Sequence, residues 1–278
     1  MPLARRTTSP DANTTDWQQN DNEVMTNSRI NTTTTDSTST IAARAPSDGS
    51  VASNAIKATT VNAGTFAAVN GTIVAGHSVR VRANGDLKVV SLAGAIAGGF
   101  VGVGVAVLVT NVGSATEAQV GPAADISAGA SAGDVVSVNA DMHEDFTGIG
   151  LAGAGGFVSV GAQVAVINDE STQHAHIDDL ARITRAGGGV DVTSNAVRGV
   201  NTYAIGVGTG AFSTGAAVAV TNVSGDNVAQ IGNVQVGTAA TPVAHLNVAA
   251  TDQITAPTLS IAVQGGVGAG VSGAVSFV

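Results

Sequence analysis

A repeat of about 56 residues constrains the fold of this chain more than any other feature of its sequence. Short strands with alternating side chains begin at Val79, Val136, Val190 and Leu246, so successive starts lie 57, 54 and 56 positions apart. Alternation with a period of two is typical of a β-strand. A unit that recurs at this spacing predicts one structural element per repeat, stabilised by stacking on its neighbours.

Two further patterns keep step with these short strands. A longer apolar strand contains V-x-V, starting at Val107, Val164 and Val218, with a fourth start at Val275. An Asn follows two positions after the first three of these pairs, where we expect a turn, because Asn tolerates left-handed backbone geometry. Seven and nine positions after each Asn come Ala and then Val or Ile: Ala118/Val120, Ala175/Ile177 and Ala229/Ile231.

The composition indicates a thin core. Aromatic residues make up 3% of the chain, whereas Ala and Val supply most of its 44% apolar residues, beside 36 Gly. Small side chains suit closely spaced backbones, so the sequence predicts an all-β parallel β-helix (β-solenoid). At roughly 20 residues per coil, one repeat would form two or three coils. We expect Val, Ile and Ala to point inward and the following residues outward: Arg80, Arg82, Ser137, Asn139, Asp191 and Thr193.

The chain divides into two regions of different composition. Residues 1–54 are rich in Thr, Ser and Asn and predict a disordered tail, because they offer little apolar surface to offset the entropy of ordering. Residues 55–278 predict about three repeat copies and a truncated fourth, which ends at Phe277-Val278. The start also has no apolar signal-peptide segment. We therefore expect this sequence to be a fragment of a longer chain.

Long apolar runs leave a membrane interpretation open. No charged residue occurs between Lys88 and Glu117 or between Asp145 and Asp169. A hydropathy window would accept these runs as membrane helices. Their β-branched Val and their Gly weaken a helix, and they lack aromatic belts and flanking basic clusters. Buried strands explain the runs better, and we expect membrane contact only through missing parts of a longer chain.

The candidate residues for chemistry have ordinary equivalents in other repeats. His174 and His176 could ligate a metal together with Asp178 or Asp179. Their equivalents are Glu117/Gln119 and Val228/Gln230, which indicates exposed polar positions.

Two acidic groups receive the same interpretation. Residues Met142 to Asp145 vary between copies as a loop would, which argues against catalysis there. Asp169-Glu170 with Asp178-Asp179 could bind calcium, but the calcium-binding nonapeptide is absent. The sequence therefore predicts no catalytic residue, no metal ligand and no cofactor-binding residue.

Charge and cysteine content exclude several other classes. The formal net charge is −9, so no basic surface is available to bind nucleic acid. The chain has no Cys, which excludes disulfides and thiol chemistry.

The repeats resemble those of very large bacterial surface adhesins of the filamentous-haemagglutinin and leukotoxin-like type. The matching stretches are VGVAVLVTNVGSATEAQV, VGAQVAVINDESTQHAHI, TGAAVAVTNVSGDNVAQI and RAGGGVDVTSNA, within residues 65–278. The resemblance implies a secreted β-solenoid exported by an autotransporter or two-partner route. The secretion domain and the membrane anchor of that family have no counterpart in this sequence.

Three functions follow as expectations. The first is a structural or adhesive shaft segment at the bacterial cell surface or outside the cell, associated with the outer membrane. Its partner would be a glycan or protein on a host or neighbouring cell. The second is a carbohydrate-active β-helix enzyme, which needs acidic side chains converging in a cleft. The third is a glycine-rich protein that inserts into membranes. The first needs no enzymatic activity.

Overall fold

Every regular element in the computed structural model is a β-strand, as far as its residues are described. The described residues are 27–37 and 51–278, with side chains from residue 56 onward, so most of the tail predicted over residues 1–54 lies outside them. The all-β prediction is confirmed. The strands are β1 (Asn27–Ser37), β2 (Val51–Val69), β3 (Thr72–Val74), β4 (Val79–Gly98), β5 (Val101–Val120), β6 (Asp125–Ser127), β7 (Val135–Asp169), β8 (Thr172–Ile177), β9 (Arg182–Arg185), β10 (Gly189–Val223), β11 (Asn227–Ile231), β12 (Gln235–Val236), β13 (Leu246–Thr255), β14 (Thr258–Gly265) and β15 (Gly270–Phe277).

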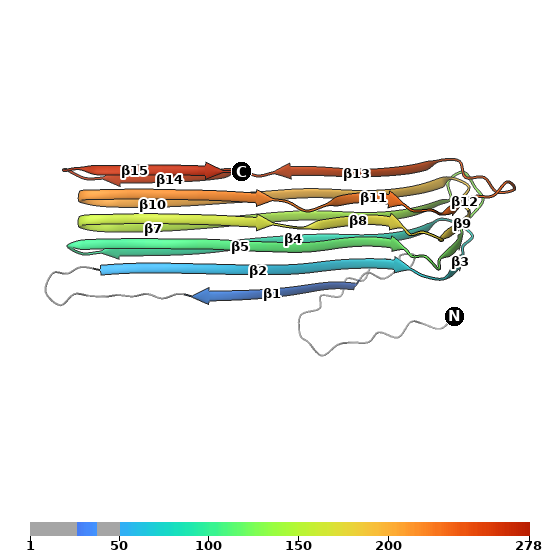
Figure 1. Cartoon of the computed structure of the whole chain (residues 1–278), viewed down its shortest axis with the longest axis horizontal. Helices are drawn as coiled ribbons and strands as arrows, with labels where there is room; N and C mark the ends of the chain where they lie inside the picture. Colours follow the sequence, from blue (N-terminus) through green and yellow to red (C-terminus); the bar gives the residue numbers. More distant parts are fainter. Residues whose placement is uncertain (1–26, 38–50) are drawn as a thin grey trace.

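The repeats stack as layers, and their strands pair in parallel (Figure 1). Val79 pairs with Val136, Val136 with Val190, and Val190 with Leu246, so the partners are the equivalent residues of successive repeats. Only β1 pairs antiparallel, with β2, among the described strand pairs. The spacing found in the sequence is therefore the spacing of the backbone pairing.

Each repeat makes one layer, not the two or three coils predicted from its length. We call the stack of layers the slab. Within one layer the chain runs along the slab, turns at its far end and comes back, so β7 alone contains both directions of one layer (Figure 1). We call the first half the outward run and the second half the return run. The predicted coil number was wrong because the strands are long: 35 residues of one repeat lie in β7 and 35 of the next in β10. Outward runs are 79–98, 135–155, 189–210 and 246–265, and return runs are 51–69, 101–120, 157–177, 211–231 and 270–277.

A second, smaller sheet lies at one end of the layers, which we call the thick end (Figure 1). The strands β3, β6, β9 and β12 form a four-stranded sheet there. Ile126 and Ile183 of this sheet pack in one core with Val81 of an outward run and Val120 of a return run. The corner between the short strand and the next outward run varies in length, covering residues 75–78, 128–134, 186–188 and 237–245 in successive layers.

The other end of the slab is thin, and glycines make this possible. A Cβ atom on Gly206 would fall on the carbonyl oxygen of Ala216, which lies in the return run of the same layer. A Cβ atom on Gly104 would likewise clash with the carbonyl of Gly153 in the next layer. The core here consists of small residues, mainly Ala such as Ala95 and Ala152. Gly is therefore needed where two backbones approach this closely.

The inward and outward positions follow the prediction at the thick end and reverse it in the V-x-V strands. Val136 and Val138 are buried, as predicted for the short anchor strands. In the return run, however, Leu108 is the buried residue, whereas its neighbours Val107 and Val109 lie on the outer face. The inward assignment of these valines was wrong because it inferred burial from hydrophobicity alone. In this strand the inward positions are Gly104, Ala106, Leu108 and Thr110.

The recurring Asn residues lie in extended strand and not in a turn. Asn168 donates from Nδ2 to Oδ1 of Asn111 over 2.8 Å, and Asn222 donates in the same way to Asn168 over 2.7 Å. They form a ladder on the outer face, which explains why Asn recurs without left-handed geometry. The A-x-I prediction is confirmed, since Ala118, Ala175 and Ala229 pair in sequence across the layers.

A partial layer precedes the first repeat found in the sequence. The return-type strand β2 pairs with β5, and Ala67 and Val69 align with Ala118 and Val120. The offset is 51 residues instead of 54 to 57, so this copy of the A-x-V pattern does not keep step with the other anchors.

Candidate functional site: a buried ionic cluster

The paired histidines lie on the outward-facing side of β8, but the predicted exposure is wrong for His176, which is buried, and His174 is half-buried. His174 is aligned with Glu117, and His176 with Gln119, in the neighbouring layer. The Nε2 atom of His176 lies 3.4 Å from Oε1 of Glu117 and 3.7 Å from Oδ1 of Asp178. Within the part of the chain that the structure describes, no three His, Asp, Glu or Cys side chains are grouped so that they could hold a metal ion.

The acidic groups considered for calcium point in different directions. Asp169 is fully buried inside the layers. Asp178 accepts a 2.5 Å hydrogen bond from Gln119 on the outer face, and Asp179 accepts one from the backbone N–H of Asn233. The structure therefore does not bring these carboxylates together.

Residues Met142 to Asp145 are an internal part of strand β7 and not a loop. Met142 and Glu144 point into the interior, whereas His143 and Asp145 face outward. Glu144 is aligned with Leu87 in the preceding layer and with Arg198 in the following one. The loop interpretation was wrong because variation between copies here marks inward positions that changed from apolar to ionisable.

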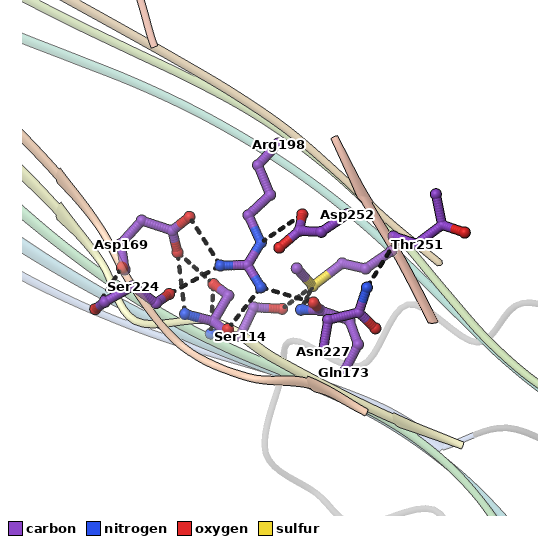
Figure 2. A network of polar contacts seen from close by, with 10 residues as sticks. Ser114, Asp169, Gln173, Arg198, Ser224, Asn227, Thr251 and Asp252 are labelled. Carbon is purple, nitrogen blue, oxygen red and sulfur yellow. Dashed lines mark hydrogen bonds and ion pairs between the residues drawn. The ribbon is translucent and has the colours of Figure 1, made fainter. Parts of the chain in front are cut away.

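A buried ionic cluster forms around Arg198, whose side chain is 1% exposed. Its guanidinium donates from Nη1 to the carbonyl of Ser224 at 2.8 Å, and from Nη2 to the carbonyl of Ser171 at 3.0 Å and to Oε1 of Gln173 at 2.7 Å. Figure 2 shows that these partners surround the planar group from several layers. We use the name buried ionic cluster for Ser114, Met142, Glu144, Asp169, Ser171, Gln173, Arg198, Ser224 and Asp252.

Two carboxylates lie on either side of the guanidinium. Oδ2 of Asp169 is 4.0 Å from Nη1 of Arg198, and Oδ1 of Asp252 is 3.9 Å from Nε. Asp169 also accepts hydrogen bonds through Oδ1 from the backbone N–H and the hydroxyl of Ser171, at 3.1 and 2.6 Å. Asp169 is thus held by a serine of its own layer and by an arginine of the next.

The third acid, Glu144, is held less closely, although Ser171, Arg198 and Ser114 each lower its pKa. Its side chain is fully buried, and neither carboxylate oxygen has a hydrogen-bond partner among the described residues. Burial, and next the negative charge of Asp169, raise the pKa of Glu144 from 4.5 to about 8. Burial also raises the pKa of Asp169, although Ser171 and Arg198 oppose that shift. Glu144 is therefore largely protonated at neutral pH.

Most of the cluster is buried inside the slab, whereas the side chain of Asp252 in the last layer is 33% exposed. The acids of the cluster converge, but they do so around a buried arginine and not in a cleft. Two depressions on the outside of the slab are lined by other residues. One of them, with a volume of about 400 Å³, is lined by Arg80, Arg82, Val135, Ser137, Asn139, Asp191 and Thr193.

The buried ionic cluster was not predicted from the sequence. Its signal was Arg198 and Glu144 at positions where other copies have Leu87 and Ile254. A charge at one position of a repeat is informative only once that position is known to face inward. The V-x-V strands had suggested the opposite assignment of faces.

Comparison with known proteins identified no relative. No family model, curated protein or solved structure matches the chain. Among residues 27–37 and 51–278, no helix has the length and hydropathy needed to cross a bilayer.

The pKa of Glu144 predicts a loss of stability as the pH rises. An acid with a raised pKa in the fold adds no pH-dependent penalty below its unfolded pKa, and this penalty grows until the pH passes the folded pKa. We therefore expect the free energy of unfolding to fall between about pH 5 and pH 8. Glu144→Leu, the residue found at position 87, should raise stability at pH 9 by at least about 2 kcal/mol.

Urea denaturation followed by circular dichroism at about pH 5 and about pH 9 measures this effect. Asp145→Asn is a matched control, because Asp145 is the exposed neighbour and lies 3.1 Å from Lys88 across the outer face. Its effect should stay small at both pH values. An equal gain from Glu144→Leu at both pH values would show that Glu144 is ionised throughout this range.

Proposed function

We propose that this chain is a structural and adhesive shaft segment of a secreted bacterial surface protein, with its repeats forming a β-solenoid. The single observation that supports the proposal best is the pairing of every repeat with the equivalent residues of the next. Because the contacts repeat, a further repeat extends the sheets by one strand each and leaves the earlier layers unchanged. Length is then set by the number of repeats.

The outer face at the thick end supports the adhesive part of the proposal. Arg80, Arg82, Asn139, Asp191 and Thr193 line the larger outer depression, and they come from three layers. This face offers cationic, anionic and amide groups together, which suits hydrogen bonding to a glycan or a polar protein surface. Two of the converging acids, Glu144 and Asp169, are fully buried, so the carbohydrate-active enzyme is the less favoured alternative.

Repeat duplication tests the shaft proposal. Residues 135–188 form one complete layer, because Val135 aligns with Gly189 at the start of the next. A chain with this segment duplicated should fold, and its urea midpoint should be equal to or above that of the parent. Electron microscopy should show a particle that is extended by one layer, about 4.8 Å, along the stacking direction.

A matched control duplicates a segment of the same length that starts at residue 150, within the outward run. This insertion also preserves the order of repeats, so a shaft should accept it equally well. Unfolding of both chains would contradict the proposal, since it would mean that the fold has a fixed number of layers. For adhesion, beads coated with the parent chain should bind cells better than beads coated with Arg80→Ala/Arg82→Ala.

A further inference from the structure

The thin end of the slab has its large apolar side chains on the outside. We call this part the blade: residues 89–111, 146–168, 200–222 and 256–278, which align with one another and contain no Asp, Glu, Lys or Arg. A sheet that packs on a core normally turns apolar side chains inward and polar ones outward. In the blade the order is reversed, because the inner positions are occupied mostly by Gly, Ala, Ser and Thr.

Both faces of the blade carry these outward apolar residues. On the outward runs, Leu151 is aligned with Ile205, and Ile205 with Ile261. On the return runs, Val164 is aligned with Val218, which in turn aligns with Val275. The side chains of the first outward run are among the most open, since Leu92 is 61% exposed and Ile96 is 74% exposed.

The tip of the blade is also apolar. Phe100, Phe157 and Phe212 lie at the turns of three successive layers and are 54%, 48% and 48% exposed. Phe100 and Phe157 stack with their centroids 5.2 Å apart, and Phe212 meets Phe157 edge-on at 5.6 Å. Val267, at the turn of the next layer, is fully exposed.

In the four layers that contain the blade, the charged residues lie toward the other end, whereas the preceding strand β2 places Lys57 beside Leu108 of the blade. The outer face of the outward runs carries Arg82 paired with Asp141 and, next to the blade, Lys88 paired with Asp145. His143, between these two pairs, is also exposed. The slab is therefore amphipathic along the direction of its strands, with polar groups at the thick end and apolar groups at the blade.

We infer that the blade enters the hydrocarbon of a lipid bilayer, tip first. The blade exposes apolar side chains on two faces and at its tip. A lipid layer can surround all three surfaces at once, whereas a protein partner would cover one face, so lipid fits this arrangement better. The outward run from Phe146 to Gly155 reaches about 33 Å at about 3.3 Å per residue, which exceeds one leaflet of a hydrocarbon core about 30 Å thick.

The hydrogen bonding and the charge of the chain indicate how deeply the blade enters a bilayer and which lipids it enters. Parallel pairing between layers satisfies the backbone groups of the interior strands, as hydrocarbon requires, but the edge strands of the stack retain unpaired groups. Partial entry of the tip therefore agrees with the fold better than a complete crossing. The net charge of −9 opposes anionic lipids, so the surface is an uncharged or zwitterionic one.

Vesicles of phosphatidylcholine test the inference directly. The chain has no Cys, so Phe157→Cys and His143→Cys can each carry a single environment-sensitive dye. Vesicles should shift the emission of the dye at position 157 to the blue and leave the dye at position 143 unchanged. No shift at position 157, or equal shifts at both positions, would overturn insertion by the tip.

Flotation of the unlabelled chain with the same vesicles gives the second measurement. Phe157→Glu/Val267→Glu should reduce the bound fraction at least about tenfold, because two apolar contacts with hydrocarbon are lost. His143→Glu/Gln253→Glu adds the same charge to the outer face of the thick end and should bind as the parent does. Circular dichroism confirms that each variant is folded before its binding is compared.

Two outcomes would replace lipid by another occupant. Equal binding of the two glutamate variants would show that the tip is not the contact. The other outcome is that the parent chain sediments as a dimer without lipid, the tip variant sediments as a monomer, and neither floats with vesicles. This result would show that the blade binds a second copy of the chain.

Discussion

Gly206→Val should cost at least about 3 kcal/mol of folding stability and lower the urea midpoint accordingly. The reason is geometric. A Cβ atom at this position would fall on the carbonyl oxygen of Ala216 in the facing return run, and a backbone atom cannot rotate away as a side chain can. The two halves of the layer would have to separate, which opens the Ala core on both sides.

Gly153→Val is the matched control for this prediction. Gly153 also lies in an outward run, but a side chain at this position would point to the outside of the slab. An added Cβ atom would lie 3.8 Å from its nearest neighbour, Cγ1 of Ile96. Its aligned residue in the next layer is already Val207. Valine should therefore be tolerated at position 153. Equal destabilisation by the two variants would mean that strand propensity, and not the spacing of the two halves, decides where Gly is required.

Arg198→Ala should destabilise the fold by about 3–5 kcal/mol, because it removes the cation from a buried site and leaves the buried carboxyl group of Asp169 without its partner. Three hydrogen bonds from the guanidinium are lost as well, and the carbonyls of Ser171 and Ser224 lose these donors in the interior. Urea denaturation at neutral pH measures the loss. Arg82→Ala removes an exposed ion pair with Asp141 and should cost less than about 1 kcal/mol.

A triple variant separates the energy of the cluster from the cost of breaking it. Glu144→Leu/Asp169→Val/Arg198→Leu installs apolar residues where neighbouring layers carry apolar residues at the aligned positions. These are Leu87 for Glu144, Val112 and Val223 for Asp169, and Ile254 for Arg198. Replacing a whole buried ionic group by apolar residues is commonly neutral or stabilising. The triple variant should therefore recover most of the stability lost in Arg198→Ala. A triple variant as unstable as the single one would show that the cluster itself holds the layers together.

The repeat was predictable from sequence because stacking in register requires the same residue type at the same position. Val136 and Ala175, for example, occupy sites that successive layers fill in the same way. The pairing of His174 with the position of Glu117 followed from the same alignment. Equivalence between copies was thus accessible without any knowledge of the three-dimensional path.

The direction of the side chains was not predictable in the same way. Alternation marks two faces of a strand, but it does not tell which one is inside. Val107 and Leu108 differ little in hydrophobicity, and the facing run, with Gly148 close to Leu108, decides the assignment. For this reason neither the buried ionic cluster nor the apolar exterior of the blade could be predicted.

The corners at the thick end have a separate consequence. Their lengths differ in every layer, from the three residues 186–188 to the nine residues 237–245, while the outward runs that follow them keep their alignment. Some corner residues bond to the neighbouring corner, as the N–H of Gly187 does to the carbonyl of Gly129, but corner length can change while the outward runs stay in register. Each corner is a position where a foreign peptide could be displayed, and successive corners would present such peptides in a row at the spacing of the layers.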